Sequence, residues 1–232
     1  MYKFMLHRAV MLNNLMGVCW VQIDLKTAQL LNSRLFHDLV GAVSAVNTGI
    51  EFMAEPGSDE DAASLLKQSA DRLTRRLDFF RAAFGLGGGK QGELSLRDAG
   101  MLVAGWFADS KSALVWPSGD ALMAVGDVGL QPVKVLMILS MMAEECLPRG
   151  GEVSIQVTRY PEGLGLATSA IGQGARAPDG TFDVLTESCS PDVLTARNVI
   201  AYFGARLAAG QGVRIEASES VDRVDYAFLI PA

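Results

Sequence analysis

His37 is the residue of this chain best suited to carry a reaction. It is one of only two histidines among 232 residues, and it stands in a stretch with strong helical periodicity. Helical geometry places it about 200° from the apolar stripe that contains Leu35, so its ring is expected to face solvent. A neutral imidazole is a good nucleophile near pH 7, since its ordinary pKa is about 6.5. Phosphoryl transfer depends mainly on alignment and charge compensation, which an exposed histidine on a rigid helix could supply.

Small side chains surround His37 on the same face of the predicted helix. They are Ser33, Gly41, Ser44 and Thr48. Residues at such helical spacings are neighbours, so the strip would let another protein approach the imidazole closely. A mid-helix glycine such as Gly41 costs roughly 1 kcal/mol relative to alanine, which favours close approach of a partner or a packing role. The alternative is a solvated surface histidine beside small residues that suit a helix.

Two amphipathic helices are predicted to position this histidine. In residues 24–53 an apolar stripe is formed by Leu31, Leu35, Leu39, Val43, Val46, Ile50 and Met53. After turn residues at 55–58, a second stripe of nearly heptad spacing is formed by Ala62, Leu66, Ser69, Leu73, Leu77, Phe80 and Phe84. Both patterns are typical of amphipathic helices. Because each stripe can face only one neighbour, we expect the hairpin to pair with a second copy as a four-helix bundle.

The pattern changes beyond residue 92 to short helices that alternate with strands. Helices are predicted at 95–107, at 132–146, where the methionines are expected in the core, and at 191–208. Strands are predicted at 113–116, 152–160, 163–170, 213–217 and 224–230. Helices packed against a mixed sheet form an α/β sandwich. The predicted fold class is therefore α+β, a helical hairpin followed by an α/β sandwich.

Three regions are predicted along the chain. Residues 1–25 are a leader of unknown role, residues 26–86 are the hairpin, which dimerises and carries His37, and residues 93–232 are the α/β domain. The apolar segment 4–23 contains His7, Arg8 and other polar residues that are costly in a membrane, so no membrane span is expected.

Composition limits the classes of function. Half of the residues are hydrophobic and 20% are charged, which is typical of a folded core. The net charge of −6 argues against nucleic-acid binding, which normally uses a basic face. Cys19, Cys146 and Cys189 are odd in number and lack metal-type spacing. Reduced thiols in a cytoplasmic protein are the simplest interpretation, with no metal site.

The residues around His37 resemble a known family. Residues 33–52, SRLFHDLVGAVSAVNTGIEF, are similar to the phosphoacceptor helix of the ChpT-type histidine phosphotransferases of the alphaproteobacterial cell-cycle phosphorelay. Residues 81–85, RAAFG, and 147–151, LPRGG, agree further, and the resemblance extends from about Leu30 to the C-terminus. It implies a homodimer whose hairpins form the four-helix bundle of sensor kinases, followed by a domain resembling a kinase ATP-binding domain.

The resemblance also implies roles for individual residues. His37 is the phosphorylated residue, and Asp38 matches the acidic residue that positions or deprotonates the ring in kinases. The expected docking surface for a receiver domain consists of Ser33, Arg34, Gly41, Ser44 and Thr48. The implied partners are the receiver domain of a hybrid histidine kinase and response regulators of the cell-cycle type. Mg²⁺ is expected on the partner receiver, and no cofactor is expected in this chain.

The C-terminal half lacks the residues with which kinases hold ATP. Where kinases have an asparagine-rich helix motif, residues 138–143 read ILSMMA, and Met142 offers no oxygen to a hard cation. Where kinases have Asp-x-Gly-x-Gly, residues 170–174 read AIGQG without the carboxylate. The sequence thus predicts phosphotransfer between receivers without ATP binding. The alternatives are a non-catalytic dimeric adaptor that docks receivers and an atypical sensor histidine kinase.

The arginines of the second helix have two interpretations. Arg72, Arg75, Arg76 and Arg81 could meet the acidic rim of a receiver domain or form a solvated helix face.

Overall fold

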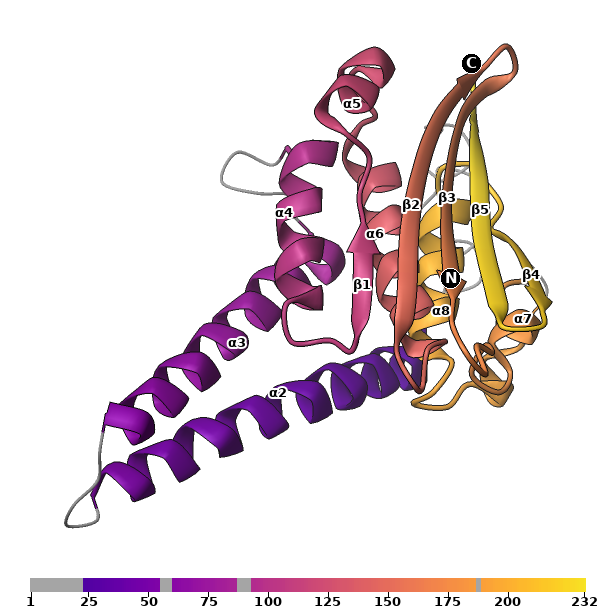
Figure 1. The fold of residues 1–232 in the computed structure, drawn as a ribbon. Coiled ribbons are helices and arrows are strands. Elements are labelled where there is room, and N and C mark those ends of the chain that lie inside the picture. The colour runs from indigo at the N-terminus through magenta and orange to yellow at the C-terminus, as the bar shows by residue number, and fades with distance from the viewer. Residues whose placement is uncertain (1–22, 55–59, 87–92, 187–188) are drawn as a thin grey trace, which may run out of the picture.

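The chain folds as a long helical hairpin that projects from a layered α/β body (Figure 1). The computed structural model describes residues 23–54, 60–86, 93–186 and 189–232. The predicted leader at 1–25, with His7 and Cys19, lies almost entirely outside these residues. No helix within the described ranges is both long and apolar enough to cross a bilayer.

The helices and strands have the following bounds. The hairpin consists of α2 (Leu25–Met53) and α3 (Glu60–Phe84). The helices of the body are α4 (Leu96–Phe107), α5 (Gly119–Val125), α6 (Leu130–Glu145), α7 (Thr181–Val184) and α8 (Val199–Ala209), with a short 3-10 helix at Pro191–Val193. Its strands are β1 (Ser112–Val115), β2 (Gly151–Tyr160), β3 (Gly163–Ile171), β4 (Glu216–Ser220) and β5 (Arg223–Pro231). The predicted α+β class is confirmed.

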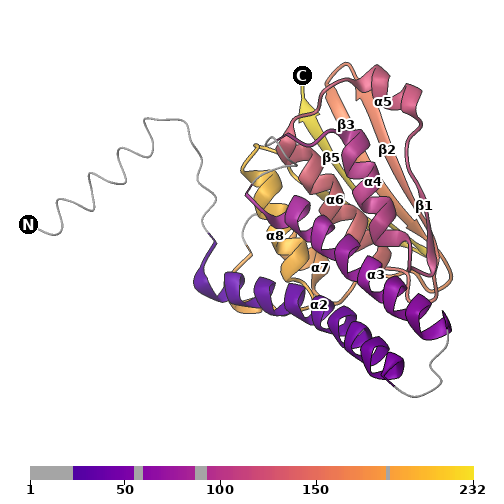
Figure 2. The same cartoon turned by 90° about the vertical axis from the view of Figure 1, so that its left-hand side faces the viewer.

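The strands form one mixed sheet in the order β1-β2-β3-β5-β4. Only the β1–β2 pair is parallel, and the other three pairs are antiparallel. Helices α4, α6 and α8 lie side by side over one face of the sheet (Figure 2). Burial alternates along β5, as expected for a strand with only one covered face.

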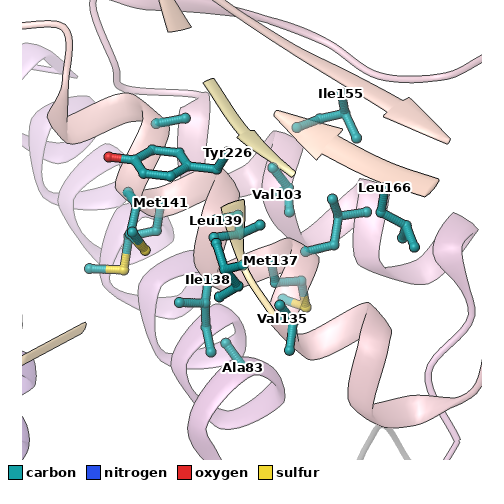
Figure 3. Close-up of a cluster of buried hydrophobic side chains, with 14 of the residues drawn as sticks. Ala83, Val103, Val135, Met137, Ile138, Leu139, Met141, Ile155, Leu166 and Tyr226 are labelled. Carbon is teal, nitrogen blue, oxygen red and sulfur yellow. The ribbon is translucent and has the colours of Figure 1, made fainter. Parts of the chain in front are cut away.

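Helix α6 forms the centre of the core. Every residue from Val133 to Ala143 is buried, so this helix has no solvent-facing side. Met137 and Met141 pack with Val103 of α4 and Leu166 of β3 in the cluster drawn in Figure 3. A helix that is buried on all sides is stable only when neighbours enclose it. The prediction that the methionines belong to the core is confirmed.

The hairpin is held to the body by contacts of α3 with α4 and with the residues just after it. The guanidinium of Arg76 lies 4.3 Å from the ring centroid of Trp106 in α4, and the Phe79 ring lies 4.7 Å from the same tryptophan. Arg75 Nη2 lies 2.7 Å from Asp109 Oδ2. Arg75 and Arg76 therefore bind this chain's own body, a role that neither interpretation of these residues included.

The last third of the chain differs from the predicted elements. The expected helix at 191–208 is interrupted, because Leu194 is extended and the Asn198 side chain accepts a hydrogen bond from the Thr195 amide at 2.8 Å. Helix α8 therefore begins only at Val199. Strand β4 begins three residues later than expected, and residues 213–215 lie outside the ladder although Val213 and Ile215 are buried. Helices α5 and α7 were not predicted, since each is too short to show a period.

Candidate active site

His37 lies in the middle of α2 with its side chain 82% exposed. The preceding Asp24 caps the helix, accepting a hydrogen bond from the Thr27 amide at 3.0 Å. The helix then runs without interruption through His37 to Met53, packed along α3. The ring is thus carried on a rigid element and is not enclosed by the described residues, as the sequence predicts.

Asp38 is the polar neighbour of the imidazole. Its Oδ1 lies 3.4 Å from Nδ1 of His37, at the outer limit of hydrogen-bonding distance. Asp38 itself is mostly buried, and its second carboxylate oxygen lies 3.6 Å from Nε of Arg34. The side chain therefore bridges an exposed imidazole and a half-buried arginine.

Arg34 links this pair to the C-terminal domain. Its Nη2 lies 2.5 Å from Oε1 of Glu145, at the end of α6 and 111 residues further along the chain. Burial raises the pKa of Glu145 to about 7, with Arg34 lowering it and Asp38 and Glu144 raising it. The Arg34 guanidinium thus lies between the carboxyl groups of Glu145 and Asp38, and Asp38 lies between Arg34 and the exposed ring of His37. We call these four residues the relay.

Sequence reasoning missed Glu145. A signal was present, because two consecutive carboxylates, Glu144 and Glu145, end an otherwise apolar helix where the helix dipole disfavours negative charge. Each has a cationic or polar partner in the fold. Glu144 accepts hydrogen bonds from Trp106 Nε1 at 3.1 Å and from the Ser110 hydroxyl at 2.6 Å.

The raised pKa of Glu145 predicts a pH-dependent stability. Between the ordinary value of 4.5 and about 7 the folded protein holds a proton that the unfolded chain has lost, so this group lowers the free energy of unfolding as pH rises. Glu145→Gln lacks this effect. From pH 5 to pH 8 the stability of the variant relative to wild type should rise by about 2–3 kcal/mol. Urea denaturation of both proteins at pH 5 and pH 8 measures this difference in the free energy of unfolding. The same difference between variant and wild type at both pH values would contradict the prediction.

The expected docking residues fall into two groups. Ser33, Gly41, Ser44 and Thr48 are all exposed on the side of α2 that bears His37. Arg34 differs, because it is half-buried and engaged by Glu145 and Asp38. The structure therefore brings the four small residues together with the imidazole and turns the arginine towards the body.

Gly41 and Gly49 stand on the same helix in opposite surroundings. A Cβ added at Gly41 would meet nothing within 4 Å, whereas one at Gly49 would lie 3.1 Å from the Cα of Leu66. Gly41 therefore has no packing role within the part of the chain that the structure describes. Gly49 is the point where α2 and α3 approach closely.

This contrast gives a matched pair of variants. Gly41→Ala should raise the free energy of unfolding by about 1 kcal/mol through helix propensity alone. Gly49→Ala gains the same propensity but overpacks the crossing with α3, so a net loss of about 1 kcal/mol is expected. Thermal denaturation of the two variants measures the difference, and stabilisation by both would show that α3 moves away freely.

Part of the predicted apolar stripe of the hairpin remains uncovered. Leu35 and Leu39 pack against the core, but Val43 and Ile50 are exposed. Further exposed apolar side chains on the hairpin are Phe36, Val40, Leu65 and Leu77. On α2, residues 36, 40, 43 and 50 recur at heptad-like spacing, so they form one stripe along the helix. We call residues Phe36, Val40, Val43 and Ile50 the open stripe.

Residues 138–143 lie in the buried middle of α6. All side chains of residues 138–143 are buried in the core, so none is directed to solvent. Within the described ranges, no three His, Cys, Asp or Glu side chains gather as metal ligands. Of the cysteines that the structure describes, Cys146 and Cys189 are free thiols.

One family model covers more than half of this chain. Residues 96–223 match the family described as histidine phosphotransferase C-terminal domain. The chain is 26% identical to the protein phosphotransferase ChpT of Brucella abortus (strain 2308) over 197 residues, which cover 85% of this chain and 92% of that protein. It also resembles a solved bacterial phosphotransferase with a TM-score of 0.74 and 24% identity, covering 89% of this chain and 97% of the other. The histidine kinase AdeS of Acinetobacter baumannii matches with a TM-score of 0.45 and 14% identity, over 84% and 97% of the two chains.

Proposed function

The chain belongs to the histidine phosphotransferase family, and on this premise we propose that it relays phosphoryl groups between receiver domains through His37. The observation that carries the proposal is the exposed imidazole of His37, fixed on a rigid helix beside the Asp38 carboxylate. In this proposal residues 26–86 form the dimerisation and phosphoacceptor domain, and residues 93–232 form an ATPase-like domain.

The transfer step follows from the position of Asp38. With Asp38 Oδ1 accepting a hydrogen bond from Nδ1–H of His37, the lone pair of the neutral ring lies on Nε2. Nε2 attacks the phosphorus of an aspartyl phosphate on the donor receiver, and the N–P bond forms as the P–O bond to the aspartate breaks. The donor leaves as a carboxylate, and the phosphorylated ring keeps its Nδ1 proton and gains one positive charge. The reverse reaction delivers the group to the aspartate of a second receiver.

Asp38 stabilises the charge that develops in this step. Its carboxylate faces the ring nitrogen that keeps the proton, and electrostatic interactions directed at developing charge lower the barrier without reorganisation. The Mg²⁺ that neutralises the phosphoryl oxygens would come with the receiver. The side chains around the ring are small, so they would not obstruct an approaching receiver. They belong to Ser33, Gly41, Ser44 and Thr48.

We further propose that the chain does not use ATP. Residues 138–143 support this, because their side chains fill the core instead of facing a nucleotide, and Met142 supplies no oxygen ligand. A kinase-like domain without nucleotide chemistry would act by holding the hairpin and by contributing surface to the partner. The proposed partners are the receiver of a hybrid histidine kinase and cell-cycle-type response regulators.

A radiolabel experiment tests the proposed phosphotransfer between receivers. Receivers of the organism's hybrid kinases and response regulators are loaded with ³²P from acetyl phosphate and mixed with the purified protein. We expect label to pass to the protein as an acid-labile, alkali-stable phosphoramidate, and labelled ATP alone to give none. Receiver binding without any transfer would instead indicate the adaptor, and labelling by ATP would indicate a kinase.

A further inference from the structure

We propose that Glu145 of the C-terminal domain is a positioning residue for chemistry at His37, acting through Arg34 on the Asp38 carboxylate. The inference rests on the proposed function, and it gives the ATPase-like body a part in phosphotransfer beyond holding the hairpin. The contacts within the relay connect Glu145 to the imidazole of His37.

The geometry of Arg34 carries the argument. Its guanidinium is divided between two carboxylates, with Nη2 at 2.5 Å from Glu145 and only Nε facing Asp38, at 3.6 Å. The short contact is the one to the C-terminal domain. Glu145 therefore fixes the guanidinium in an orientation that leaves Asp38 Oδ1 available for the imidazole at 3.4 Å.

Removing Glu145 would release this arrangement. Arg–carboxylate pairs favour a bidentate geometry, so a freed Arg34 would close its fork on Asp38, which already lies 3.6 Å from Nε. The Asp38 carboxylate would then turn away from Nδ1 of His37. Its charge would be paired with Arg34 and would no longer stabilise the positive charge that develops on the ring. Glu145 thus holds Arg34 away from full engagement with Asp38.

Only two histidines exist in the chain, so NMR can observe His37 directly. In full-length protein labelled with ¹⁵N-histidine at pH 8, which is above the ordinary imidazole pKa of about 6.5, the nitrogen shifts report which ring atom carries the proton. We expect wild type to hold the Nδ1–H form. Glu145→Ala should shift the ring towards the Nε2–H form, and Glu145→Gln, which still accepts a hydrogen bond from Arg34, should fall between the two. His7→Gln assigns the signals.

The rate at which His37 is phosphorylated is measured in the same variants. Phosphoramidate, a small donor that needs no docking surface, is used to phosphorylate His37, and the acid-labile product is followed with time. Glu145→Ala should slow this labelling on the order of tenfold, since misplacement of a catalytic group by even 1 Å is costly. The matched control is Asp109→Asn, which removes the carboxylate that pairs with Arg75 at the same interface without touching the relay.

The outcomes separate the two proposals. Loss of labelling in Glu145→Ala but not in Asp109→Asn, together with the tautomer shift, supports the positioning role. An unchanged tautomer and an unchanged rate in both Glu145 variants would overturn the positioning role, but would leave the proposed phosphotransfer through His37 unaffected. An equal loss in the Asp109→Asn control would also overturn it, because the effect would then belong to the interface in general. Labelling of wild type at a residue other than His37 would instead refute the proposed function.

Discussion

His37→Ala is expected to abolish phosphoryl uptake from a phosphorylated receiver, while His7→Ala leaves it unchanged. The imidazole is the nucleophile of the proposed step, and no other described side chain beside it offers a ring nitrogen. Its removal is therefore expected to eliminate the phosphohistidine entirely and not merely to slow its formation. Transfer of ³²P from the receiver, followed on gels before and after acid treatment, measures the loss.

The fold should survive this substitution, which makes the result interpretable. His37 is 82% exposed and its only polar contact among the described residues is with Asp38, so an alanine there costs no packing and suits a helix. Circular dichroism and receiver binding by the variant serve as controls. Acid-labile phosphate on His37→Ala would refute the assignment of the site, and undiminished uptake without any phosphohistidine would refute the mechanism.

The residues of the site differ in how far they could be predicted from sequence. The exposure of His37 and the strip of small residues follow from spacing along one helix, which is local information. The contact of Asp38 with the ring needed a rotamer that spacing does not fix, and the resemblance supplied the expectation. Glu145 reaches Arg34 across 111 residues of sequence, so no periodic pattern could have joined them. Only the packing of α6 against the hairpin brings that carboxylate to the site.

The helices and strands also differ in whether local sequence could predict them. Helix α4 could be predicted with its cap, because Ser95 accepts a hydrogen bond from the Asp98 amide within one turn. The break before α8 could not, since it depends on the Asn198 side chain competing for the Thr195 amide. Strand β4 was misplaced because Val213 and Ile215 are apolar and buried without being in the sheet. Burial sets the apolar pattern, whereas ladder pairing also depends on a partner strand.

Ile50→Glu is expected to convert a dimer of this protein into a monomer. The open stripe exposes large apolar side chains along α2, with Phe36 and Val40 each 62% exposed and Ile50 53% exposed, and exposed apolar side chains that gather on one face are typical of an interface. We propose that a second copy covers it and forms a four-helix bundle with two-fold symmetry. The symmetry would place the new carboxylate in the seam twice per dimer.

The size of the effect follows from burying charge. An unpaired carboxylate in an apolar seam costs several kcal/mol, so two of them should weaken the dimer by about 4 kcal/mol or more, roughly a thousandfold in Kd. Met123→Glu is the matched control, because Met123 is 76% exposed but lies on α5, away from the hairpin. Sedimentation equilibrium measures the masses of both variants and of wild type.

The position of Ile50 also separates assembly from chemistry. It lies thirteen residues beyond His37 on the same helix, a distance of about 20 Å at 1.5 Å per residue. Labelling of His37 by phosphoramidate should therefore persist in the monomer, because the relay is built within one chain. A monomeric wild type, or a dimer that tolerates Ile50→Glu, would show that something other than a second hairpin covers the open stripe. Loss of phosphoramidate labelling on dissociation would instead mean that the partner chain completes the site around the imidazole.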